Sequence, residues 1–134
     1  MRTLLSAFLA FILVGCESSR HSSNSRNDAN LQNKIIGTWI CYWGNGNVHS
    51  TTVVSAWGGY ATQIEGFKYN RPPILIEGKF QVSNGDLVDT IIKYSQKSVT
   101  VPFVVHGHIK QLSDKLLIVR WDGREKDSEY QKAD

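Results

Sequence analysis

Apolar and β-branched residues alternate with polar ones along most of the chain, and no long segment shows a helical period. The alternation is clearest over residues 74–82, where Ile74, Ile76, Phe80 and Val82 fall on one face of a predicted strand. The intervening positions include charged and amide side chains, which suit a face exposed to water. This two-residue period is typical of β-strands with one buried face.

The same pattern recurs between clusters of Gly, Asn, Asp and Pro, which favour turns. It predicts eight strands, over residues 35–43, 48–57, 60–67, 74–82, 87–95, 101–111, 115–121 and 125–130. Most of the connections are short enough for hairpins. The sequence therefore predicts an all-β fold, an antiparallel up-and-down meander that closes into a barrel and so leaves no free sheet edge.

The first sixteen residues follow a different pattern. Arg2 precedes an apolar run over residues 4–14, and Gly15 and Cys16 end it. Eleven helical residues rise about 16 Å, roughly half the ~30 Å hydrocarbon core, so the run is too short for a transmembrane helix. A basic start, a short apolar run and a small residue at the exit predict a secretory signal peptide.

The exit sequence Leu13-Val14-Gly15-Cys16 resembles the lipobox of bacterial lipoproteins. This resemblance implies cleavage before Cys16, lipid attachment to Cys16 with palmitate-type acyl chains, and anchoring to a membrane in the cell envelope. Several acyl chains on one residue give stable anchoring. Because Glu17 rather than Asp follows the cysteine, the resemblance further favours the outer membrane, facing the periplasm.

The mature chain then has two parts. Residues 16–33 contain the lipidated cysteine and a Ser- and Asn-rich stretch with one leucine, which predicts a flexible tether. Residues 34–134 have the length of one small domain. Cleavage removes Arg2 and no acid, which leaves 14 basic against 12 acidic residues. So small a positive charge argues against a nucleic-acid partner.

The domain resembles small bacterial lipocalin-like proteins of the calycin type. Ile36-Gly37-Thr38-Trp39 resembles the Gly-x-Trp signature of the first lipocalin strand, and residues 77–87 resemble a later hairpin motif with Phe80 in the aromatic position. The resemblance spans roughly residues 35–124. It implies that Trp39 plugs the closed end of a barrel, with Arg120 or Arg124 stacked on it in a cation–π contact.

Few residues suggest chemistry at a reactive centre. His106 and His108 have a spacing that a metal site can use, but no third ligand is indicated, and two solvated histidines are the simpler interpretation. Cys41 has no partner once Cys16 carries lipid; between Trp39 and Trp43 it is expected to be buried and inert. The carboxylates are expected in turns and at outward positions. No catalytic residue, metal site or cofactor site is therefore predicted.

Aromatic residues are the main functional indication. They either fill the barrel or line a cleft for an apolar ligand. The candidate ligand-binding residues are Trp39, Trp57, Phe80, Tyr94, Phe103 and Trp121. We expect a non-enzymatic lipoprotein that binds a small apolar molecule. The alternative is an interaction module, an inhibitor or a subunit of a cell-envelope assembly, whose loops 44–47 and 68–73 contact a protein partner.

Overall fold

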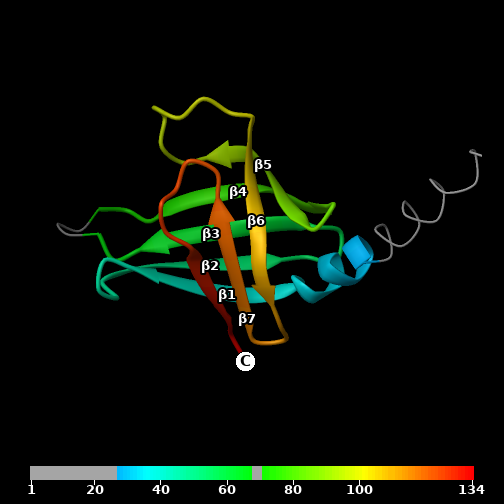
Figure 1. Cartoon of the computed structure of the whole chain (residues 1–134). Helices are drawn as coiled ribbons and strands as arrows, with labels where there is room; N and C mark the ends of the chain where they lie inside the picture. Colours follow the sequence, from blue (N-terminus) through cyan, green and yellow to red (C-terminus); the bar gives the residue numbers. More distant parts are fainter. Residues whose placement is uncertain (1–26, 68–70) are drawn as a thin grey trace, which may run out of the picture.

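The computed structural model describes residues 27–67 and 71–134. They form eight strands, and Figure 1 shows their arrangement. The bounds are β1 (Gly37–Trp43), β2 (Val48–Val54), β3 (Gly59–Glu65), β4 (Ile74–Ser83), β5 (Asp86–Tyr94), β6 (Phe103–Leu112), β7 (Leu116–Trp121) and β8 (Ser128–Lys132). The predicted signal peptide, Cys16, the first part of the tether and residues 68–70 lie outside the described residues.

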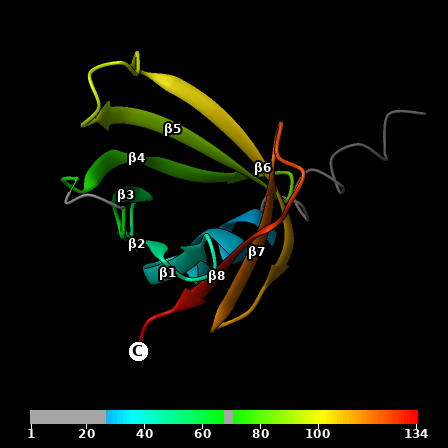
Figure 2. The ribbon, with the colours of Figure 1, turned by 90° about the vertical axis from the view of Figure 1, so that its left-hand side faces the viewer.

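Each strand pairs antiparallel with the next, and β8 pairs back with β1 to close the barrel. The closing seam joins Trp39, Ile40 and Cys41 to Lys132, Gln131 and Tyr130. Figure 2 faces one end of the barrel and shows the strands around a central space. The predicted all-β up-and-down barrel is confirmed.

Alternation sets which side chains enter the barrel. On β4, Ile76, Gly78 and Phe80 are less exposed than the residues between them, and on β6 the same holds for Phe103 and Val105. Both inward faces were predicted from the two-residue period, which sends successive side chains to opposite sides of a sheet.

The second strand is shorter than its predicted range of 48–57. It ends at Val54, because a tight turn joins β2 to β3: Ser55 N donates to Gly59 O over 2.8 Å, and Gly58 N donates to Ser55 O over 3.0 Å. Gly58 has a φ of 79°, and a Cβ there would lie 2.5 Å from Phe80 O, so glycine suits this position. Trp57 consequently lies in the turn and not in a strand.

Residues 27–34 form a helix, where the sequence predicted flexible chain up to residue 33. This helix covers one end of the barrel (Figure 1). β3 begins at Gly59, opposite Lys79, so β4 continues beyond its neighbour. The helix supplies partners there: Gln32 Nε2 donates to Phe80 O over 3.2 Å, and Gln32 Oε1 accepts from Val82 N over 2.8 Å.

A second contact fixes the start of the helix. The Asp28 carboxylate accepts hydrogen bonds from Asn84 N and Gly85 N, at 2.8 and 2.9 Å, in the β4–β5 turn. Leu31, the one leucine of the predicted tether, packs against the buried cluster that fills this end of the barrel. That cluster comprises Ile35, Trp39, Val54, Tyr60, Val82, Leu87, Leu117 and Val119. The last residues of the predicted tether are therefore part of the domain.

Candidate functional site

The barrel is hollow toward the end that the helix leaves open. Its cavity has a volume of about 910 Å³. Residues near the β1–β2, β3–β4, β5–β6 and β7–β8 connections line the mouth, and the helix and the other turns lie at the closed end. Both the volume and the mixture of apolar walls with a few polar groups are typical of small-molecule sites.

Five of the six predicted ligand-binding residues line this cavity, namely Trp39, Phe80, Tyr94, Phe103 and Trp121. They come from β1, β4, β5, β6 and β7. Trp57 does not join them: its side chain is 88% exposed, in the β2–β3 turn at the closed end. Its place in a tight turn, outside the alternation of either strand, explains the difference.

Trp39 forms the floor of the cavity. Its side chain is 2% exposed, and its Nε1 donates to Ile35 O over 2.8 Å. The expected arginine does not stack on it. Lys132 takes that place instead, with Nζ 5.1 Å from the ring centroid, because β8 pairs with β1 directly opposite Trp39. A cation of either type is attracted to the ring face.

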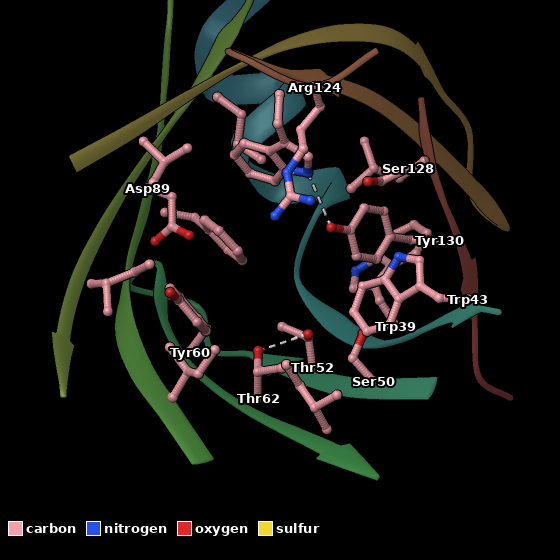
Figure 3. A pocket seen from close by; sticks show the side chains of 18 of the residues that line it. Trp39, Trp43, Ser50, Thr52, Tyr60, Thr62, Asp89, Arg124, Ser128 and Tyr130 are labelled. Carbon is pink, nitrogen blue, oxygen red and sulfur yellow. Dashed lines mark hydrogen bonds between the residues drawn. The ribbon is translucent and has the colours of Figure 1, made fainter. Parts of the chain in front are cut away.

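The two arginines suggested for that contact lie elsewhere. Arg120 faces outward, and its Nε donates to Asp127 Oδ1 over 2.5 Å. This contact lowers the pKa of the Asp127 carboxyl below its ordinary value. Arg124 lies in the β7–β8 connection, and its guanidinium extends into the cavity (Figure 3). The mouth therefore has a positive group, Arg124, which the sequence had suggested for the cation–π contact with Trp39.

Asp89 lies inside the barrel, contrary to the expectation that carboxylates occupy turns and outward positions. It is on β5 between the inward-facing Leu87 and Ile91, and it is 8% exposed. Its Oδ1 has no hydrogen-bond partner among the residues that the structure describes. The alternation Leu87-x-Asp89-x-Ile91 was a signal in the sequence, but apolar residues on both faces of this segment obscured which face is inward.

Burial raises the pKa of Asp89 to about 6, because the charged form loses hydration. The nearby Tyr60 hydroxyl acts in the opposite direction, since a hydrogen bond to the carboxylate favours ionisation. Burial, followed by the charge of Asp89, also raises the pKa of Tyr60 well above its ordinary value. Tyr60 stacks on Phe80 with ring centroids 4.1 Å apart, which fixes the phenol beside Asp89.

The opposite wall carries hydroxyl groups. Thr52 and Thr62 are hydrogen-bonded to each other over 2.8 Å, across β2 and β3 (Figure 3). On β8, Tyr130 accepts a hydrogen bond from Trp121 Nε1 over 3.2 Å. Burial raises the pKa of Tyr130 to about 12, so its phenol is neutral at ordinary pH. Neutral hydroxyls and the Asp89 carboxylate therefore face the aromatic rings inside the barrel.

The groups considered for reactive chemistry lie away from the cavity. Cys41 is buried as expected, at 1% exposed, and burial raises the pKa of its thiol to about 11, so the thiolate is scarce. His106 and His108 are on the outer face of β6, and His108 Nδ1 lies 2.7 Å from Asp86 Oδ1. Within residues 27–67 and 71–134, no three His, Cys, Asp or Glu side chains are grouped for a metal ion.

Comparison with known proteins does not identify a related site. No protein-family model, no curated protein and no solved structure matches the chain. The helical part of the described structure contains no segment with the length and apolar character needed to cross a bilayer.

Proposed function

We propose that the protein is a non-enzymatic binding protein that holds a small organic ligand with an apolar body inside its barrel. The main support for this proposal is the cavity of about 910 Å³, which is lined by aromatic side chains and open at one end. An eight-stranded barrel has room either for a packed interior or for one small ligand. The cavity in this barrel favours the second.

The lipocalin-like sequence features agree with this proposal. The Gly-x-Trp tryptophan, Trp39, lies at the floor of the barrel, where the resemblance implies it. The upper walls offer aromatic rings and hydroxyls, and the hydroxyl that lies beside a carboxylate there, Tyr60 next to Asp89, is a phenol whose pKa is raised, which suits retention of a ligand more than its conversion. A shared barrel type alone does not specify a ligand; the cavity of this barrel is what supports one.

The proposal includes the membrane anchor. Lipid on Cys16 would join the domain through residues 17–26 and the helix, which docks at the closed end. The mouth, at the opposite end, would then be free of the attachment point. Replacing Cys16 with Ser is expected to abolish fatty-acid labelling and to release the protein from the membrane fraction; unchanged labelling would contradict the anchor.

Ligand binding is tested with a neutral apolar dye and a matched pair of variants on β6. Val105 lines the cavity, whereas Val104, the next residue, points outward and is 52% exposed. We expect saturable enhancement of Nile red emission by the purified protein. Val105→Trp should fill the cavity and reduce the affinity about tenfold or more, and Val104→Trp should leave it within about twofold.

The outcomes separate clearly. Equal binding by the two variants would place the dye on the outer surface and contradict the proposal. The absence of saturable binding by the unmodified protein, for this dye and for fatty acids alike, would do the same. Far-UV circular dichroism of both variants checks that the barrel is intact.

A further inference from the structure

The interior carboxylate of Asp89 distinguishes this cavity from a purely apolar one. In the barrel wall its neighbours are Phe80 on β4 and Val105 on β6, neither of which offers a hydrogen bond from its side chain. None of the ion pairs within residues 27–67 and 71–134 includes Asp89. A buried carboxylate without a cationic partner is costly, unless a ligand provides one.

The groups facing Asp89 across the cavity do not provide that partner. Tyr60 on β3 and Tyr130 on β8 are the titratable groups whose pKa values respond to the charge of Asp89, and both are phenols. Arg124 is the charged side chain labelled in Figure 3 that reaches into the cavity, from the β7–β8 connection. It is exposed at the mouth, where water hydrates it, and it makes no ion pair with Asp89.

We infer that the preferred ligand carries a protonated amine on its apolar body and that Asp89 accepts this amine inside the barrel. The inference depends on the proposed ligand-binding function and specifies the chemical class of the ligand. An ammonium group donates charge-assisted hydrogen bonds, which are roughly twice as strong as neutral ones. The aromatic rings around Asp89 would pack against the apolar body and attract the cation through their faces.

Asp89 and Arg124 predict opposite preferences. The other charged residues that line the cavity lie beside Arg124 in the exposed β7–β8 connection, namely Asp122, Glu125, Lys126 and Asp127. Arg124 alone would favour an anionic ligand held at the mouth, whereas Asp89 favours a cation held inside. Asp89 is the stronger candidate because it lines the interior of the barrel, where water screens it little, and no cationic side chain of the described residues pairs with it. An anion at Arg124 would compete with water for an exposed side chain.

Three probes with the same ring and different charges test the inference: 1-naphthylmethylamine, 1-naphthylmethanol and 1-naphthylacetate. Their affinities for the purified protein are measured by calorimetry at pH 8. We expect the amine to bind at least tenfold more tightly than the alcohol, and the carboxylate to bind most weakly. Tightest binding by the carboxylate would assign selectivity to Arg124 and overturn the inference.

Two variants on β5 locate the effect. Asp89→Asn keeps the shape and removes the charge, so it should lower the affinity for the amine about tenfold or more and leave the alcohol within about threefold. Asp86→Asn is the control, because Asp86 faces outward and contacts His108; it should leave both affinities unchanged. Equal loss in both variants, or none in Asp89→Asn, would overturn the inference.

The dependence on pH gives an independent measurement. Protonation of Asp89, whose pKa is about 6, removes the charge that the amine needs. Affinity for the amine should therefore fall about tenfold for each pH unit below that value, with no such fall for the alcohol or in Asp89→Asn. Binding of the alcohol without preference for the amine, or binding of Nile red by a protein that binds none of the three probes, would refute the inference alone. Failure of the three probes together with Nile red and fatty acids would refute the proposed function.

Discussion

The two ends of the barrel differ in how their interiors are filled. The closed end is packed with apolar side chains around Trp39, Leu87 and Val119, which are at most 2% exposed. The open end holds space, rings that are partly exposed, and the polar groups Asp89 and Arg124. One half of the molecule therefore supplies stability, and the other half accepts buried charge and empty volume, both of which lower stability.

The largest expected effect on stability comes from replacing Trp39, the residue at the floor of the cavity. Trp39→Ala should reduce the free energy of unfolding by about 3–5 kcal/mol, because it deletes a buried ring and leaves a cavity in the packed half. Trp43→Ala, at the mouth and 36% exposed, should cost less than about 1 kcal/mol. Urea denaturation followed by circular dichroism measures both, and similar losses would remove the distinction between the two ends.

The next effect has the opposite sign. Asp89→Asn should stabilise the protein at pH 8 by roughly 2–3 kcal/mol, because folding raises the carboxyl pKa from its ordinary 3.8 to about 6. Between these values the unfolded chain ionises while the folded protein keeps its proton. Stability of the unmodified protein therefore falls as the pH rises through this window, and the penalty is complete above about pH 6.

The same denaturation series at pH 4, 5, 6 and 8 checks the sign. The difference between Asp89→Asn and the unmodified protein should shrink to roughly 0.5 kcal/mol at pH 4, where the folded state is protonated and the unfolded chain is about half protonated. A gain that is constant with pH would show that ionisation of Asp89 is not its cause. Such a result would contradict the interpretation that the ionised Asp89 carboxylate lowers the stability of the open half.

A smaller loss is expected at the helix that covers the closed end. Gln32→Ala removes the partners of Phe80 O and Val82 N, and it should cost about 1–2 kcal/mol. Asn30→Ala, on the same helix and exposed, is the matched control and should change stability by less than about 0.5 kcal/mol. Faster hydrogen exchange at Val82 N in Gln32→Ala alone would confirm the local origin of the loss.

The smallest effect is expected at Trp57, which tests whether a position at the closed end matters when its side chain is exposed. Trp57 lies at the closed end but is 88% exposed, so Trp57→Ala should change stability by less than about 0.5 kcal/mol. Ligand affinity should also be unchanged, since Trp57 is outside the cavity. A large loss of either would show that the β2–β3 turn contributes more than its exposure indicates.

The sequence predicted the barrel because two-residue alternation is strong on β4 and β6 and because turn residues separate the strands. The sequence was less informative where a residue type occurs both in strands and in turns, or where a polar residue lies on the inward face. Trp57 favours a strand but lies in a turn that Ser55 and Gly58 dictate. Asp89 occupies an inward position that burial disfavours; its alternation with Leu87 and Ile91 indicated this face, and the register of β5 with β4 and β6 identifies it as interior.

The helix 27–34 was missed for a different reason. Its composition is that of a solvated segment, and its stability comes from contacts with the β4–β5 turn that no local pattern specifies. The spacing of Asp28, Leu31, Gln32 and Ile35 at three and four residues is a helical signal, visible once their partners are known. The four hydrogen bonds that Asp28 and Gln32 make with β4 and the β4–β5 turn join residues 48 to 57 positions apart, so they depend on the folded barrel.

The seam between β1 and β8 has a consequence for the order in which the domain folds. It consists of three residue pairs that join the first strand of the domain to the last, whereas every other strand pairs with its neighbour in sequence. Hairpins from β1 to β7 can form as the chain emerges, but the ring is incomplete until Tyr130 and Lys132 are available. Contacts this distant in sequence form slowly, so a chain in which β8 has not yet docked exposes two unpaired edges. Folding of the barrel is therefore complete only once β8 has paired with β1.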